Sequence, residues 1–116
     1  MALPETVRVS ALSRLNAYCE RRAPESVRDE VEVEARLRGD KITIVERRAP
    51  WRPDFGPEWT ESKVAQIEFH PAVRTWRLFA YDRNERRVVY PFLPATRDLD
   101  VVIDELERDP ICIFGR

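Results

Sequence analysis

The stretch from Lys63 to Phe92 limits the folds open to this chain more than any other part of the sequence. It contains three short segments rich in β-branched and aromatic residues, at about 63–70, 73–82 and 86–92. The turn-forming dipeptides Pro71-Ala72 and Arg83-Asn84 separate these segments. Segments this apolar need a second layer to pack against, so we expect them to form the middle of an antiparallel sheet.

Two more strands are predicted before this stretch. Apolar and charged residues alternate from Val31 to Leu37, a pattern that buries one face of a strand and leaves the other face in water. Gly39-Asp40 supplies a turn, and the chain is expected to return as a strand over 41–48. The five strands are therefore predicted to follow one another as an antiparallel meander.

Helical periodicity is present towards both ends of the chain. The first helix is predicted from Pro4 to about Arg22, and the second after Pro94, with Thr96 as its N-cap and Asp109-Pro110 at its end. Their apolar stripes are Leu12, Leu15 and Cys19 in the first helix and Leu99, Val102, Ile103 and Leu106 in the second. We predict a single α+β domain over 1–116, a five-stranded antiparallel meander with the N-terminal and C-terminal helices packed on one face.

The two turns also predict which side chains share a face of the sheet. With two-residue loops, Ile67 lies opposite Trp76 and Leu78 lies opposite Val89, on the face that the helices cover. The opposite face, called the outer face below, then mixes aromatic, basic and polar groups. Its predicted members are Val64, Gln66, Glu68, Arg77, Phe79, Tyr81, Arg86, Val88 and Tyr90.

Several short motifs are spread over nearly the whole chain. They are Trp76-x-Leu78, Tyr81-Asp82-Arg83-Asn84 followed by Tyr90, and the terminal Asp109-Pro110 and Phe114-Gly115. In this order the sequence resembles a family of small, uncharacterised bacterial domains. The resemblance implies a helix, a strand meander and a second helix. Because the family brings no known activity, it supports the fold and leaves the function open.

The composition disfavours several classes of function. The 20 Lys and Arg residues face 21 Asp and Glu residues, and the resulting net charge of −1 argues against bulk attraction to a polyanion or a membrane surface. The single histidine, His70, precedes a turn, and Cys19 and Cys112 match neither a metal-ligand spacing nor a disulfide framework. We predict no cofactor, no metal site and no designated catalytic residue. Without a leader or an apolar span, the chain is expected to be cytoplasmic.

One set of residues combines arginines with aromatic rings, a mixture common at protein and RNA interfaces. Its members are Arg77, Tyr81, Arg86 and Tyr90 on the sheet and Trp51, Arg52, Phe55 and Trp59 in the preceding loop. We predict a non-catalytic interaction domain that uses the outer face and the 49–60 loop to bind a protein partner, either another protein or a second copy of the chain.

Three alternatives remain open. The same residues would suit weak binding of single-stranded RNA. An enzyme of undefined type is a further alternative, since chemistry by carboxylates alone needs no histidine or cysteine. Finally, Trp51, Phe55 and Trp59 would cover the outer face if they folded over it as a small satellite core.

Overall fold

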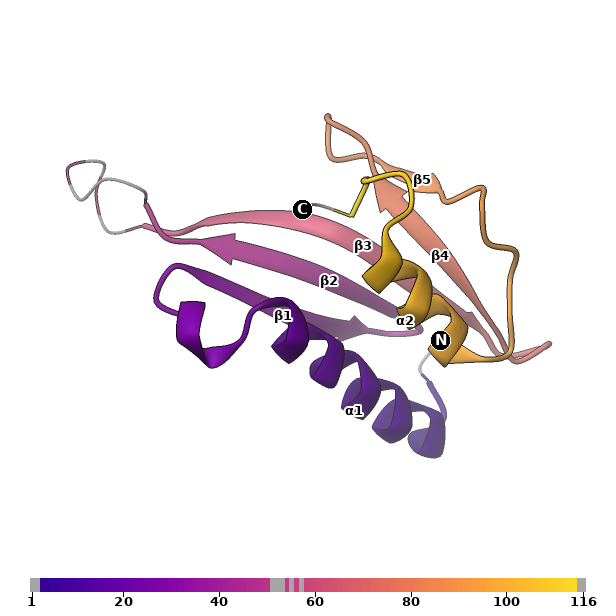
Figure 1. The fold of residues 1–116 in the computed structure, drawn as a ribbon. Coiled ribbons are helices and arrows are strands. Elements are labelled where there is room, and N and C mark those ends of the chain that lie inside the picture. The colour runs from indigo at the N-terminus through magenta and orange to yellow at the C-terminus, as the bar shows by residue number, and fades with distance from the viewer. Residues whose placement is uncertain (1–2, 51–53, 55, 57, 115–116) are drawn as a thin grey trace.

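The computed structural model describes residues 3–50, 54, 56 and 58–114 (Figure 1). Its α-helices in these residues are α1 (Glu5–Arg22) and α2 (Leu99–Arg108), and a short 3-10 helix, η1 (Glu25–Val27), follows α1. The strands are β1 (Val31–Arg38), β2 (Lys41–Arg48), β3 (Thr60–His70), β4 (Thr75–Tyr81) and β5 (Arg87–Val89). Neighbouring strands pair antiparallel in the order β1-β2-β3-β4-β5, which confirms the predicted meander.

The hydrophobic core lies between the sheet and the two helices, which cover the same face (Figure 1). Ile42, Ile67 and Leu78 stand side by side on β2, β3 and β4 and are fully buried. Leu15 of α1 and Leu106 of α2 are buried against this cluster. Each of these side chains contributes about 1.5–3 kcal/mol to folding. The α+β fold with both helices on one face is therefore confirmed.

The second helix begins later than predicted. Its N-cap is Asp98, whose Oδ1 accepts a hydrogen bond from the backbone N of Asp100 at 3.0 Å. Thr96 instead pairs with Trp76 through two backbone hydrogen bonds of 2.6 and 2.9 Å. The prediction of Thr96 as N-cap is wrong because its backbone extends the sheet beside β4.

The turn between β3 and β4 is longer than predicted. Its loop covers 71–74, between the paired residues His70 and Thr75, and Arg74 has a φ of 55°. Ile67 therefore lies opposite Leu78 and not opposite Trp76. The shift amounts to two residues, so this turn leaves the β4 side chains on their predicted face.

The turn between β4 and β5 has one residue more than predicted, and here the difference matters. Glu85 adopts a φ of 60°, and the backbone N of Asp82 bonds to the carbonyl of Arg86 at 3.0 Å. Val89 consequently lies opposite Phe79, where Val88 had been expected. A shift of one residue turns each β5 side chain to the other face. The placement of Arg86, Val88 and Tyr90 on the outer face is therefore wrong.

A second irregularity corrects the position of Val64. The pairing of β2 with β3 shifts between Ile44 and Val45, so that Ile44 lies opposite Ala65 while Val45 lies opposite Lys63. Val64 falls within this bulge and belongs to the buried core cluster. The expectation that Val64 lies on the outer face is wrong, because an extra residue in one strand re-aims the side chains beside it.

Tyr90 lies on the helix side of the sheet and is 1% exposed. Its hydroxyl donates a hydrogen bond of 2.5 Å to Oε2 of the buried Glu105, and its ring packs against Phe114 with centroids 5.1 Å apart. Oε1 of Glu105 accepts a second bond of 2.9 Å from Arg108. Burial, followed by the hydrogen bond to Glu105, raises the pKa of Tyr90 to about 12. Tyr90 thus joins β5 to α2 and to the C-terminal segment.

Replacing Glu85 with Gly is expected to raise the free energy of unfolding by about 1 kcal/mol, because glycine adopts a positive φ without the Cβ clash. Asn84→Gly in the same loop is the control, since Asn84 has no positive φ. Urea denaturation of the two variants measures the difference. Equal stabilisation by both substitutions would contradict the assignment of strain to Glu85.

Replacing Tyr90 with Phe is expected to lower the free energy of unfolding by about 1–3 kcal/mol, because the buried Glu105 loses one of its two partners. Tyr81→Phe is the matched control, because no described residue bonds to the Tyr81 hydroxyl. Denaturation curves at neutral pH compare the two variants. A loss of the same size in both would contradict a specific role for the Tyr90 hydroxyl.

The same pair predicts a pH dependence. The folded-state pKa of Tyr90 is raised from 10.0 to about 12, so its contribution is fully present below pH 10 and is lost as the pH rises through that range. The difference in unfolding free energy between wild type and Tyr90→Phe should therefore shrink above pH 10.

Candidate functional site

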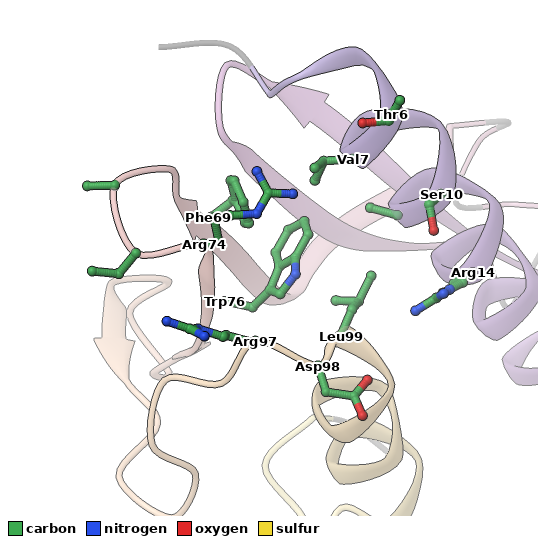
Figure 2. A pocket seen from close by; sticks show the side chains of 13 residues that line it. Thr6, Val7, Ser10, Arg14, Phe69, Arg74, Trp76, Arg97, Asp98 and Leu99 are labelled. Atoms are coloured by element: carbon green, nitrogen blue, oxygen red, sulfur yellow. The ribbon is translucent and has the colours of Figure 1, made fainter.

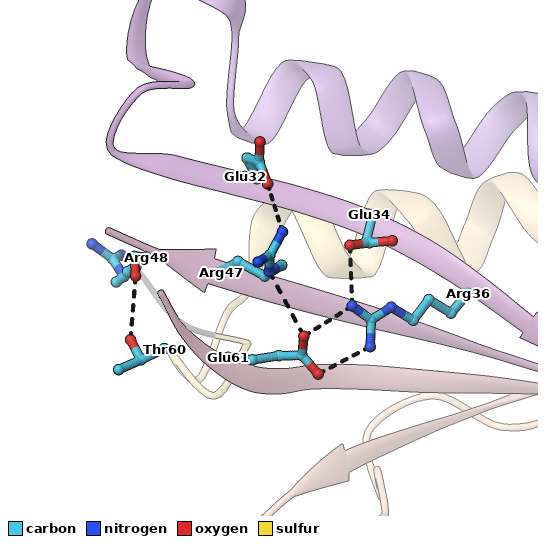
Figure 3. A network of polar contacts seen from close by, with 7 residues as sticks. All are labelled: Glu32, Glu34, Arg36, Arg47, Arg48, Thr60 and Glu61. Carbon is cyan, nitrogen blue, oxygen red and sulfur yellow. Dashed lines mark hydrogen bonds and ion pairs between the residues drawn. The ribbon is translucent and has the colours of Figure 1, made fainter. Parts of the chain in front are cut away.

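The outer face carries a network of ion pairs centred on Glu61 (Figure 3). Arg36 donates two hydrogen bonds of 2.9 Å, one to each carboxylate oxygen of Glu61. Arg47 lies 3.8 Å from Glu61 and donates a bond of 3.1 Å to Glu32. The hydrogen bonds from Arg36, together with the charge of Arg47, hold the pKa of Glu61 below its ordinary value. The network therefore pairs acids and arginines of β1, β2 and the first half of β3 with one another.

Cations also lie over the aromatic rings of this face. The guanidinium of Arg87 is 3.8 Å from the centroid of Phe79 and donates bonds of 2.8 Å to Gln66 and 2.9 Å to Glu68. Among the described residues, Lys63 also lies over Tyr81 at 5.5 Å and Arg47 over Trp59 at 5.7 Å. Long basic side chains can cover apolar surface with their stems in this way while their charged ends keep polar partners or water.

The structure separates the residues that the sequence grouped as a partner site. Arg77 and Tyr81 lie on the outer face of β4, the first exposed and the second partly buried. Arg86 is exposed at the end of the β4–β5 hairpin, and Trp59 is partly buried near Arg47. Tyr90 lies on the other side of the sheet. The remaining candidates, Trp51, Arg52 and Phe55, lie outside the described residues.

A pocket of about 600 Å³ lies between α1, the β3–β4 loop and the start of α2, on the helix side of the molecule (Figure 2). Its floor includes Trp76 and Phe69, and Arg14, Arg74 and Arg97 stand around it. No motif in the sequence links these arginines, because they come from a helix, a hairpin loop and a helix-capping segment. The pocket therefore has no signal in the sequence.

A second pocket, of about 790 Å³, lies near the opposite ends of the two helices. Its charged groups are largely paired with one another, as in the contacts of Arg21 with Glu107 at 2.8 Å and Arg22 with Glu46 at 3.4 Å. Cys112 also lines it and is exposed. Among the described residues, this pairing leaves the pocket without a clearly unpaired charge.

Comparison with known families shows to which family the chain belongs. A family model described as a domain of unknown function, DUF3024, matches residues 3–116. The chain belongs to the DUF3024 family. This membership confirms the resemblance to a small uncharacterised domain family and brings no activity with it. No curated protein and no solved structure matches the chain.

Burial changes the state of the single buried thiol among the described residues of the DUF3024 domain. Burial raises the pKa of the Cys19 thiol to about 11, so little reactive thiolate forms near neutral pH. Within residues 3–50, 54, 56 and 58–114, no three His, Cys, Asp or Glu side chains are grouped to hold a metal ion. No helix in the same residues is long and apolar enough to cross a membrane.

Replacing Arg36 with Gln is expected to raise the pKa of Glu61 towards its ordinary value of 4.5, because the hydrogen bonds from Arg36 are the largest cause of the lowering. Arg38→Gln is the control, since Arg38 is on the same face of β1 without an ion pair to any described residue. NMR titration of the Glu61 carboxyl measures both variants. An unchanged Glu61 pKa in Arg36→Gln would contradict the network.

Proposed function

We propose that this DUF3024 domain is a non-catalytic interaction module that holds a protein partner against its outer face, at the β5 edge. The observation that supports this most is a group of exposed apolar side chains in and after β5. Val89 lies on the outer face opposite Phe79, and Val88 lies opposite Ala80 on the helix side of the same edge strand. Val88 is 41%, Val89 52% and Phe92 62% exposed. Exposed apolar side chains gathered at one place commonly mark a contact surface.

The position of this group at the edge of the sheet adds to the argument. β5 pairs with β4 on one side, and no described strand pairs with its other side. The opposite edge strand, β1, carries charged residues such as Glu34 and Arg36, which protect an edge from pairing. β5 has one charged residue in three, so it is the edge better suited to accept another chain.

Arg77 and Tyr81 extend the proposed contact onto the outer face. Arg77 is exposed and forms no ion pair with a described residue, and Tyr81 remains partly exposed two residues further along β4. Arginine and tyrosine are enriched at protein interfaces because each offers a large contact area together with hydrogen-bond donors. Trp59, at the end of the 49–60 loop, would enlarge the contact at the far end of the sheet.

Single-stranded RNA is less well supported as the partner. Base stacking needs a free aromatic face, whereas Phe79, Tyr81 and Trp59 each have a cation over the ring. Glu61 and Glu68 also neutralise arginines that phosphates would need. An enzyme has less support still, since the groups on this face pair with one another. We place the domain in the cytoplasm, in keeping with the free thiols of Cys19 and Cys112.

A photo-crosslinking residue in place of Val89 is expected to give a discrete protein adduct, either with a second copy in the purified chain or with another protein in cells of the source organism. The control carries the same residue in place of Ala17, which is exposed on α1. Adding Arg77→Glu to the Val89 variant should weaken the adduct by removing a cation of the proposed contact. Electrophoresis and mass spectrometry detect the products.

Two results would refute this proposal. The first is that the Val89 position yields no adduct in either setting, and the second is that Ala17 yields the same adducts. Oligonucleotide binding that falls steeply with salt and is lost in Arg77→Glu would favour the RNA alternative.

A further inference from the structure

The pocket at the start of the two helices collects positive charge that the described residues do not neutralise. Arg74 and Arg97 line it, and neither forms an ion pair or hydrogen bond with a described residue. Arg14 has a long contact of 3.4 Å with Asp100. Asp98 is the single acid in the lining, and its Oδ1 already accepts the helix-capping bond from Asp100. The pocket therefore keeps an excess of cations.

The floor of this pocket is flat and apolar and includes one free donor. Trp76 is 5% exposed and packs against Phe69, with ring centroids 4.7 Å apart. No described residue accepts a hydrogen bond from the indole Nε1, yet every fully buried side-chain nitrogen in the described residues has a partner. The indole nitrogen therefore keeps access to the pocket, and Figure 2 shows it on the side of the ring that faces Leu99.

The arginines are held at the pocket by the backbone. Arg74 has a φ of 55°, which costs a residue with a Cβ about 1 kcal/mol relative to glycine. Arg97 lies between Thr96, which pairs with the backbone of Trp76, and Asp98, which caps α2. Figure 2 shows Trp76 between Arg74 and Arg97, with Arg14 across from them. The cations and the indole thus converge on one space from three elements.

We propose that this pocket binds a small organic oxyanion, a carboxylate or a phosphate attached to a flat apolar group. Guanidinium groups bind both anions through paired hydrogen bonds, and Arg74 and Arg97 are free to do so. The floor of Trp76 and Phe69 would take the apolar part. A volume of about 600 Å³ fits a small molecule and is too confined for a folded partner.

The test uses naphthoate and naphthyl phosphate as probes, because both combine an oxyanion with a flat apolar ring. Naphthamide has the same ring without the charge, and inorganic phosphate has the charge without the ring. Two-dimensional NMR of the nitrogen-labelled full chain follows the indole signal of Trp76, assigned with Trp76→Phe. Both anionic probes are expected to shift this signal and to bind at least tenfold more tightly than naphthamide or phosphate alone.

Two variants test whether Arg74 and Arg97 bind the anionic group of the probe. Arg97→Gln and Arg74→Gly are each expected to weaken binding of naphthyl phosphate about tenfold, the loss of one charge-assisted contact. Arg74→Gly also relieves the positive φ, so its thermal midpoint should not fall, and weaker binding cannot be ascribed to unfolding. Arg83→Gln is the control, because Arg83 is an exposed arginine of the distant β4–β5 hairpin.

Three results would contradict the proposal, each for a different reason. Equal affinity for naphthamide would mean that the floor binds apolar rings and that the arginines are not a binding site. An equal loss in Arg83→Gln would assign the effect to overall charge. No shift of the Trp76 signal with either anionic probe up to about 10 mM, well above a weak dissociation constant, would overturn the proposal.

Discussion

The attachment of β5 to α2 depends on the hydrogen bond between Tyr90 and Glu105. β5 pairs with β4 over three residues, a ladder too short to fix the rest of the chain. Tyr90 follows directly and places its ring on the helix side of the sheet. Its hydroxyl lies 2.5 Å from Oε2 of Glu105 in α2, and its ring centroid lies 5.1 Å from that of Phe114. A buried carboxylate is tolerated where it is hydrogen-bonded, so Tyr90 and Arg108 satisfy Glu105 while Glu105 holds the Tyr90 hydroxyl beside α2.

The helices and strands could be predicted because the signals that specify them are local. Alternation from Val31 to Leu37 and the apolar stripes of α1 and α2 record burial directly in residue spacing. The register of β1 with β2 follows from the predicted Gly39-Asp40 turn, since Arg38 lies opposite Lys41. The registers of β4 with β3 and β5 could not be predicted, because Arg74 and Glu85 adopt a positive φ at positions where glycine or asparagine normally signals such a turn. The error of two residues at Arg74 left the faces unchanged, while the error of one residue at Glu85 moved Tyr90 across the sheet.

The composition of the outer face was partly predictable, and its pairing was not. Arg77, Phe79 and Tyr81 follow from alternation along β4. The bond from Arg36 to Glu61 crosses over β2, since Arg36 itself lies opposite Thr43. Which acid that guanidinium reaches depends on the register shift after Ile44 and on the twist of the sheet, and neither has a signal in the sequence.

Net charge describes this molecule poorly, because the charges differ in how they are paired. A balance of 20 basic and 21 acidic residues suggests a surface with little attraction for anions. On the outer face this holds locally, since Glu61 and Glu68 pair with Arg36 and Arg87. The pocket beside Trp76 differs, because its arginines come from three elements while its acid is engaged in capping α2. Because salt screens charges beyond about a Debye length, an anion responds to the charges close to it and not to the net charge of the whole chain.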